Sequence, residues 1–365
     1  MKRVLILGCT GSIGKSSIDI VQNMSEDFTV CGLQAHSNKD ELLKLSKEFN
    51  CPTLLSSEDN SEEAFNKLID ESKPDIVING IAGAAGLLPS KVVLENKIDL
   101  ALANKETIVM AGPLIKKLAK KNNVKLIPVD SEHSAIFNLV ENFGSKNISK
   151  IVITASGGPF REYTSEQLKN VTVEQALKHP TWNMGTKITI DSSTLANKGL
   201  EVIEAAYLFD VTHEQIEVVV HPQSLIHSLV RTKDGMLYAQ ISDPDMKHPI
   251  FGALCWPNYK DTYLKPFDLF DHTMTFYKPR YDDFPMLNYA FDCVKEKKSY
   301  TIAYNSANEI AVDAFINKKI SFTQIFDVVK FVLDKDWSQE ISSFEQVFEQ
   351  DKLARKIAID KLGQL

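Results

Sequence analysis

Two carboxylates lie one residue apart at the end of an apolar run, in the segment VDSEHSAIF (residues 129–137). Asp130 and Glu132 flank Ser131, and in an extended segment residues i and i+2 point to the same side. Like charges placed in this way repel each other unless a bound cation, an arginine or a shared proton offsets the repulsion. The sequence therefore predicts an extended segment whose paired carboxylates need a positive partner.

A second polar segment, HPTWNMGTKITIDSSTLANKGLEVIEAAYLF, covers residues 179–209. Its residues 187–190, KITI, predict a short strand, and Ser193 or Thr194 is then expected to cap a helix with regularly spaced apolar residues.

Asn197, Lys198 and Glu201 are three and four residues apart on that helix, so their side chains are neighbours. Lys198 and Glu201 could form a surface ion pair worth roughly 0.5 kcal/mol. Together with Ser192, however, the amide and the ammonium are also groups that bind a phosphate monoester at the start of a helix.

Glu201 would then be a third carboxylate for the site that Asp130 and Glu132 begin. Three carboxylates without a suitable Cys/His cluster favour a hard divalent cation, Mg²⁺ or Mn²⁺, over zinc. A bound cation is thus the favoured partner of the paired carboxylates. His133 could join as a further ligand, but a supporting or structural role is favoured.

The first residues, VLILGCTGSIGKSSIDIV (residues 4–21), predict a buried strand, a glycine turn and a helix. Glycine allows close approach of a pyrophosphate, and the first N–H groups of the helix are donors for it. A plain turn without a ligand is the alternative. Main-chain N–H groups for the phosphates are expected from Thr10, Ser12 and Ile13.

A second strand, about residues 29–33, ends where an NAD-binding domain normally has an acidic residue for the ribose hydroxyls. Here the chain has His36, Ser37, Asn38 and Lys39 instead. These groups suit a 2′-phosphate, so NADPH is favoured over NADH. The alternative is an ordinary polar loop.

Two more strands are expected within residues 75–87 and 98–109. Ligands of a doubly wound sheet bind at the carboxyl ends of its strands, where the second of these segments has Asn104, Lys105 and Glu106. The three residues could equally begin a helix, with Asn104 as its cap. The two interpretations are compatible.

Residues 150–161 predict another strand that ends in Ser156 and two glycines, either an anion-binding nest or a glycine turn. Trp182, between Pro180 and Gly185, lies in a polar context. It belongs either to a mobile lid or to a buried loop anchor.

The composition is that of a globular protein with two or three domains: 365 residues, 44% apolar and 24% charged. A net charge of −7 gives no indication of wholesale nucleic-acid binding, although it leaves room for a local basic pocket that binds a phosphate. The five cysteines form no CxxC pair, and no apolar stretch reaches the ~18 residues of a membrane span. The first strand begins so early that no targeting peptide is expected. A cytoplasmic location is predicted.

Taken together, these segments resemble the 1-deoxy-D-xylulose 5-phosphate reductoisomerase family of the non-mevalonate isoprenoid pathway. Seven stretches between residue 8 and about residue 314 carry the resemblance, in the family's order. They are GCTGSIG, ALANKE, VDSEHSAIFN, TASGGPFR, HPTWNMGTKITIDSSTLANKGLEVIEA, HPQSLIHS and AYNSANEIAVDAF.

The resemblance implies a role for each matching residue. NADPH would contact Thr10, Gly11, Ser12, Ile13, Ser37, Asn38, Asn104, Glu106 and Gly185. The metal ligands would be Asp130, Glu132 and Glu201. Substrate would contact Lys105, Ser131, Glu132, Ser156, His179, Trp182, Ser192, Asn197, Lys198 and Glu201. Lys105, Asp130, Glu132 and Glu201 would be catalytic, with Lys105 mediating proton transfer. Trp182 and Met184 would lie on a closing flap (about residues 178–188), and His227 would line the same cleft.

The family fold is α/β: a Rossmann-like doubly wound N-terminal domain, an α+β central catalytic domain and an all-helical C-terminal domain. The expected boundaries are 1–127, 128–265 and 282–365, with a linker at 266–281. The implied reaction is the NADPH- and metal-dependent conversion of 1-deoxy-D-xylulose 5-phosphate, a small phosphorylated sugar, to 2-C-methyl-D-erythritol 4-phosphate. A homodimer with no nucleic-acid or membrane partner is also implied. As a departure, residues 35–38 lack the basic residue that some members use for the 2′-phosphate.

Two rival functions are weighed against this one. A simple NADP-dependent dehydrogenase would not need three metal-binding carboxylates. A cofactor-sensing regulatory protein would be expected to have lost one of Lys105, Asp130, Glu132 and Glu201, and the sequence retains all four.

Overall fold

The computed structural model describes residues 1–365 and divides them into two compact units. Unit 1 comprises residues 1–107, 115–137 and 245–268, and unit 2 comprises residues 108–114, 138–244 and 269–365.

Unit 1 is built on a six-stranded sheet in which every neighbouring pair of strands is parallel. In spatial order the strands are β3 (Thr53–Leu55), β2 (Phe28–Ala35), β1 (Lys2–Leu7), β4 (Ile76–Asn79), β5 (Asp99–Leu102) and β6 (Leu126–Pro128). The order 3-2-1-4-5-6 is that of a doubly wound dinucleotide-binding fold. Its switch point lies between β1 and β4, where a ligand is expected.

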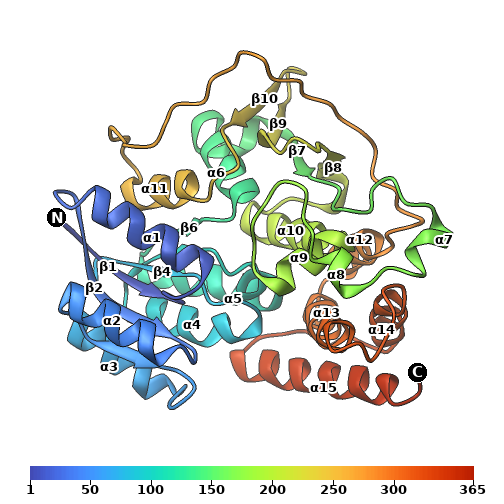
Figure 1. Cartoon of the computed structure of the whole chain (residues 1–365), viewed down its shortest axis with the longest axis horizontal. Coiled ribbons are helices and arrows are strands. Elements are labelled where there is room, and N and C mark those ends of the chain that lie inside the picture. Colours follow the sequence, from blue (N-terminus) through green and yellow to red (C-terminus); the bar gives the residue numbers. More distant parts are fainter. The chain divides into compact units, whose positions relative to one another are not determined.

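Helices cover both faces of this sheet, since the consecutive residues Val4 to Leu7 of β1 are all at most 1% exposed. One face packs against α1 (Ser12–Asn23), α2 (Lys39–Phe49) and α11 (Lys247–Cys255). The unit also contains α3 (Glu62–Ser72) and α4 (Leu87–Glu95), which are labelled in Figure 1. The short 3₁₀ helix η1 (Ala84–Gly86) immediately precedes α4. The helices α5 (Lys105–Asn122) and α6 (Ser131–Phe143) begin in unit 1.

Unit 2 contains a four-stranded mixed sheet with the order β10-β9-β7-β8. The strands are β7 (Ile148–Ala155), β8 (Ile216–Val220), β9 (Ile226–Thr232) and β10 (Leu237–Ile241). β7 pairs in parallel with β8 and antiparallel with β9, and β10 forms one edge.

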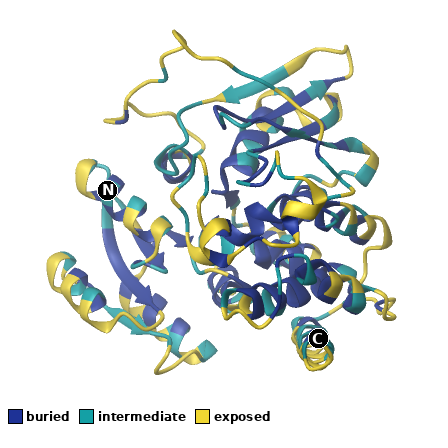
Figure 2. Ribbon diagram, turned by 45° about the vertical axis from the view of Figure 1, so that its right-hand side comes forward, coloured by how far each residue is buried: buried dark blue, intermediate teal, exposed yellow.

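The helices of unit 2 include four that follow one another at the C-terminus. They are α12 (Met286–Glu296), α13 (Tyr300–Ile316), α14 (Gln324–Leu333) and α15 (Phe344–Leu362). Phe322 lies between Phe160, Phe315 and Phe326, with ring centroids 5.3–5.8 Å away. The helix that ends the chain is largely exposed on its outer side (Figure 2). The remaining elements are α7 (Ser165–Leu168), α8 (Val173–Ala176), α9 (Thr186–Ser193), α10 (Ala196–Leu208) and the 3₁₀ helices η2 (Ser145–Asn147) and η3 (His213–Gln215).

Two local predictions are wrong. Residues 187–190 are helical and belong to α9, although their β-branched side chains favour a strand. Lys187 and Asp191, one helical turn apart, form an ion pair of 2.7 Å that only the helix allows. Moreover, neither Ser193 nor Thr194 is the cap of α10, because that position is taken by Leu195 with a positive φ of 60°.

The paired carboxylates also do not lie on an extended segment. Asp130 immediately precedes α6, and Glu132 lies in its first turn, where an acidic side chain interacts favourably with the helix dipole. The pattern that suggested a strand is therefore the start of a helix.

The predicted fold class is confirmed: a Rossmann-like parallel sheet, a second mixed sheet and a helical C-terminal region. None of the helices has both the length and the apolar character needed to cross a bilayer. The three-part domain division stays a prediction.

Candidate active site

The turn between β1 and α1 leaves the start of α1 open. Gly11 occupies the cap position and no side chain caps the helix, so the first N–H groups of Ser12 and Ile13 have no capping partner. A Cβ on Gly14 would lie 2.4 Å from the Cα of Cys9, and Gly8 has a φ of 78°. Only glycine fits both positions, and the turn suits a pyrophosphate.

The loop after β2 presents the predicted 2′-phosphate groups. Ser37 and Asn38 are exposed, and Asn38 caps α2 by accepting from the Glu41 N–H at 3.3 Å. Lys39 pairs with Glu58 at 2.9 Å, so this cation is partly neutralised. The loop thus offers hydroxyl and amide groups.

Asn104 organises the corner at the end of β5. Its Oδ1 accepts from the Thr107 N–H at 2.9 Å, which makes it the cap of α5. Its Nδ2 donates to the carbonyl oxygens of Ile81 and Gly83 and to Glu106 Oε2, at 2.7, 2.8 and 3.0 Å. The capping interpretation is correct, and the amide also ties the loop after β4 to the Glu106 carboxylate.

Asp130 is held by two partners. Lys105 Nζ lies 2.7 Å from its Oδ2, and the Nδ1–H of buried His133 donates to its Oδ1 at 3.1 Å. Burial raises the pKa of Asp130, but the charge of Lys105 and the hydrogen bond from His133 outweigh it, so the pKa lies well below its ordinary value. The carboxylate is therefore ionised at neutral pH, as a metal ligand must be.

Ser131 and Glu132 complete the start of α6. The hydroxyl of Ser131 donates to Glu132 Oε2 at 2.6 Å, which orients the carboxylate at the N-terminal end of the helix.

In unit 2, His179 joins two of the predicted phosphate ligands. Its Nε2 lies 3.0 Å from Ser156 Oγ and 3.1 Å from Ser192 Oγ. Its Nδ1 accepts from the backbone N–H groups of Thr181 and Trp182, at 3.2 and 2.8 Å. Because Nδ1 is an acceptor, the proton of the neutral ring is on Nε2.

Burial lowers the pKa of His179 to about 4, so the ring is neutral at pH 7. A protonated Nε2 cannot accept from a serine, so the hydroxyl hydrogens of Ser156 and Ser192 point elsewhere. Two oriented hydroxyl donors on one rigid ring are well suited to an anion.

The segment after His179 carries the predicted flap residues. The Trp182 ring centroid is 6.2 Å from that of His227, whose Nε2 lies 2.8 Å from Ser242 Oγ. Gly185 caps α9, and a Cβ there would meet no atom within 4 Å. The space beside Gly185 is thus open.

The first turns of α10 bring three predicted residues together. Asn197 donates to Glu201 Oε1 at 2.6 Å, and Lys198 Nζ forms an ion pair with Glu201 Oε2. The side chains of Lys198 and Glu201 are only 5% and 1% exposed. This pair is therefore buried rather than a surface ion pair, and each charge compensates for the desolvation of the other.

The predicted residues thus form separate groups in each unit. Within unit 1, Asn104 contacts Glu106, Lys105 contacts Asp130, and Ser131 contacts Glu132. Within unit 2, His179 contacts Ser156 and Ser192, and Glu201 contacts Asn197 and Lys198. Unit 1 thus presents the carboxylates of Asp130 and Glu132 and unit 2 that of Glu201, and carboxylate oxygens are the ligands that magnesium prefers.

Sequence analysis missed two supporting residues. Asp191, next to Ser192, is buried and accepts at 2.7 Å from Asn308 on α13. No sequence spacing could reveal a contact between residues 117 positions apart.

A doubly wound parallel sheet with an open glycine turn after its first strand is the architecture of a dinucleotide-binding protein. Within that class, the chain belongs to the 1-deoxy-D-xylulose 5-phosphate reductoisomerase family. Residues 4–63 and 56–112 match the family description "1-deoxy-D-xylulose 5-phosphate reductoisomerase". Residues 126–209 and 241–357 match two descriptions of the family's C-terminal domains.

Relatives of the same name are similar over their full lengths. The reductoisomerase of Treponema denticola is 49% identical over 99% of this chain and 97% of the relative. That of Chlorobaculum tepidum is 46% identical over 100% of both chains.

Solved structures of the family have the same fold. A DOX-P reductoisomerase in complex with NADPH, fosmidomycin and magnesium has a TM-score of 0.91 and 36% identity, over 100% of this chain and 98% of the other. The Zymomonas mobilis enzyme in complex with NADPH has the same TM-score and identity over 100% of both chains. The predicted family is confirmed.

Proposed function

We propose how the residues of this chain carry out the family's reaction. As a family member, the chain is an NADPH- and magnesium-dependent enzyme that rearranges and reduces 1-deoxy-D-xylulose 5-phosphate to 2-C-methyl-D-erythritol 4-phosphate.

Magnesium would be held by Asp130, Glu132 and Glu201. When bound, the metal polarises the carbonyl and an adjacent hydroxyl of the substrate, and NADPH supplies the hydride. The observation that carries this assignment is the contact of Lys105 and His133 with Asp130, which keeps the carboxylate charged and oriented.

Lys105 would act on protons of the substrate oxygens. Its ammonium lies 2.7 Å from Asp130, so a substrate oxygen near the metal ligands would come within hydrogen-bond reach of it. Ser131 and Glu132 would hold the same hydroxyls.

The substrate phosphate would bind Ser156 and Ser192, with His179 between them. Asn197 and Lys198 would add an amide and a positive charge from the start of α10. The pairing of Lys198 with Glu201 supports this assignment, since a metal on Glu201 would compete for the carboxylate and leave the ammonium available to the phosphate.

NADPH would contact the open start of α1 through its pyrophosphate and the loop after β2 through its 2′-phosphate. Asn104, Glu106 and Gly185 would contact the nicotinamide end. The segment of residues 178–188 would close as a flap, with Trp182 and Met184 over the substrate. Binding energy from the phosphate would drive that closure.

The proposal includes three further properties. The enzyme would work with Mn²⁺ as well as with Mg²⁺, it would be cytoplasmic, and it would be a homodimer. The dimer is supported by the edge strand β10, which has unpaired backbone groups and the exposed residues Leu237 and Ile241. We also propose the three-domain division at residues 1–127, 128–265 and 282–365.

A molecule with a hydroxamate and a phosphonate about three carbons apart tests the metal and phosphate sites together. Its hydroxamate would chelate the cation with two oxygens, and its phosphonate would replace the phosphate. Linking the two groups should give affinity about 10²-fold or more above that of either fragment. Lys198→Ala should weaken binding of this molecule without abolishing metal binding, and Glu201→Gln should weaken both.

The matched control is Lys352→Ala, on the outer side of α15. It should leave the affinity unchanged. If the affinity of this molecule depended neither on Mg²⁺ nor on the Lys198→Ala substitution, the assignment of the two sites would be refuted.

A further inference from the structure

Asp191 is a buried carboxylate one residue before a proposed phosphate ligand. Its side chain is only 2% exposed, and it accepts from Lys187 Nζ and from Asn308 Nδ2, each at 2.7 Å. Lys187 and Asp191 belong to α9, and Asn308 belongs to α13. A buried charge is costly unless its oxygens are paired, so these contacts hold α9 against α13.

The orientation of the Asn308 amide is set by this contact. The side chain is fully buried, and its Oδ1 has no hydrogen-bond partner. A flipped amide would place that oxygen against the Asp191 carboxylate, so the amide keeps Nδ2 toward Asp191. An unpaired buried carbonyl is unfavourable, and the bond to the carboxylate offsets its cost.

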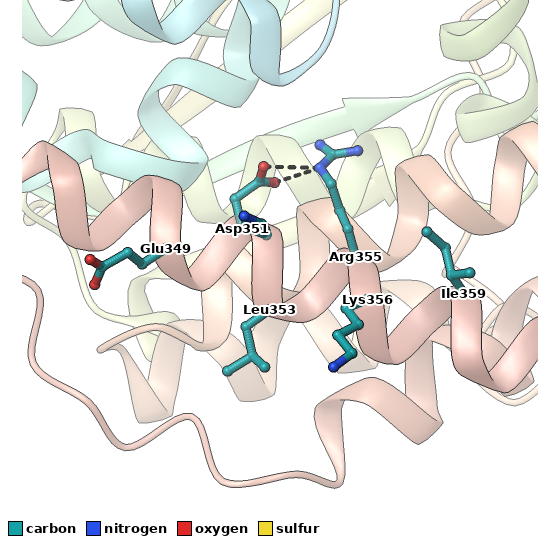
Figure 3. Close-up of a pocket in the computed structure, with 7 residues that line it drawn as sticks. Glu349, Asp351, Leu353, Arg355, Lys356 and Ile359 are labelled. Carbon is teal, nitrogen blue, oxygen red and sulfur yellow. Dashed lines mark hydrogen bonds and ion pairs between the residues drawn. The ribbon is translucent and has the colours of Figure 1, made fainter.

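Helix α13 is itself fixed from its other side by α15. The hydroxyl of Ser306 donates to Asp351 at 2.6 Å, and Arg355 donates to Asp351 at 2.9 Å and to Glu309 at 2.6 Å. Figure 3 shows Arg355 and Asp351 joined along α15. These contacts tie α13, and with it Asn308, to the last helix of the chain.

Successive residues of a helix point about 100° apart, so a fixed Asp191 side chain determines where the Ser192 hydroxyl points. That hydroxyl lies 3.1 Å from His179, which also contacts Ser156. A rotation of α9 about its axis would move Ser192 away from His179 and leave Ser156 in place.

We propose that Asp191 and Asn308 are positioning residues that aim the Ser192 hydroxyl at the substrate phosphate, and that the C-terminal helices set phosphate affinity through this contact. The inference rests on the proposed function, in which Ser192 binds the phosphate. Asn308 touches no substrate and acts through Asp191.

The test uses Asn308→Ala in the full chain. We expect the KM for 1-deoxy-D-xylulose 5-phosphate and the Kd for inorganic phosphate each to rise about 10-fold, with kcat within threefold and the Kd for NADPH unchanged. The matched control is Asn305→Ala, on the same helix. Asn305 is equally buried and has an equally unpaired Oδ1, but it contacts Glu309 instead of Asp191.

Asn305→Ala should lower the melting temperature as Asn308→Ala does, yet leave KM and phosphate binding within twofold of the native values. Equal losses of phosphate affinity in both variants would refute the inference, because they would reflect general destabilisation. The double variant Asp191→Asn with Asn308→Asp exchanges donor and acceptor, and it should recover most of the affinity. If it recovers none, the specific contact is not the cause.

Ser192→Ala separates failure of this inference from failure of the proposed function. If Ser192→Ala weakens phosphate binding and Asn308→Ala does not, the positioning role alone is wrong. If Ser192→Ala has no effect on phosphate binding, the phosphate site and the positioning role are both overturned.

Discussion

The two units differ in the protein groups that are proposed to bind phosphate: backbone N–H groups in unit 1 and side chains in unit 2. The proposed pyrophosphate site of unit 1 consists of the open N–H groups at the start of α1, so its donors are backbone atoms. The proposed phosphate site of unit 2 consists of side chains, those of Ser156 and of the segment from His179 to Lys198. A backbone site tolerates changes of neighbouring side chains but fails where glycine is replaced. A side-chain site depends on the residues that orient it.

The proposed metal ligands should give the largest effect, because the charge that they hold acts directly on the reacting oxygens of the substrate. Asp130→Asn keeps the shape of the side chain but removes the negative charge that pairs with Lys105 and that would hold the cation. We expect kcat to fall by roughly 10³-fold, the scale of losing one preorganised electrostatic contact, with NADPH binding retained. Steady-state rates at varied Mg²⁺ measure this. Asp360→Asn on α15 is the control, and near-native activity of Asp130→Asn would exclude Asp130 as a ligand.

Gly14→Ala tests the backbone site. The new Cβ would lie 2.4 Å from Cys9 Cα and from the Gly8 carbonyl oxygen, so the turn must shift. Loss of a hydrogen bond to the charged pyrophosphate, worth about 3 kcal/mol, corresponds to roughly 10²-fold in affinity. We expect the Kd for NADPH to rise by about that factor in a fluorescence titration. Gly252→Ala, where a Cβ meets no atom within 4 Å, should leave it unchanged. Tight NADPH binding by Gly14→Ala would show that the turn does not hold the pyrophosphate.

Ser37→Asp tests the cofactor preference at an exposed side chain of unit 1. A carboxylate there would repel a 2′-phosphate and accept from ribose hydroxyls. The ratio of kcat/KM for NADPH to that for NADH should fall about 10-fold, and Ser37→Ala should change it less. Native use of both cofactors at equal efficiency would contradict the predicted NADPH preference.

The protonation of His179 should have the smallest effect on the protein, a local one on the pH dependence of its stability. Its folded pKa of about 4 lies below the ordinary value of 6.5. Between these values the unfolded chain therefore binds more protons, and this group destabilises the fold as pH drops through that window. A nuclear magnetic resonance titration, assigned with His179→Gln, should place its midpoint near 4. A midpoint above 6 would refute the neutral, hydroxyl-orienting ring.

The contrast between the units also explains what the sequence could predict. The glycine turn, the Asn104 cap and the buried strand before the turn are local signals, and all are present in the structure. The strand prediction for residues 187–190 is wrong because consecutive β-branched residues favour a strand. Packing of α9 against α10 and α13, together with the Lys187–Asp191 ion pair, stabilises a helix instead.

Other features of the site could not be predicted because they depend on tertiary contacts. Leu195 adopts a positive φ that sequence rules assign to glycine or asparagine. The Asp191–Asn308 bond joins distant segments. The roles of Asp130, Glu132 and Glu201 came from family resemblance together with residue chemistry, since the spacing alone suggested an extended segment.

The most direct test of the account is the oxidation of NADPH in the presence of 1-deoxy-D-xylulose 5-phosphate, followed by absorbance, with the product identified by mass spectrometry and nuclear magnetic resonance. The account predicts stoichiometric formation of 2-C-methyl-D-erythritol 4-phosphate that stops in excess EDTA and resumes when Mg²⁺ is restored. Turnover that is insensitive to metal removal, or a reduced product with an unrearranged carbon skeleton, would contradict it.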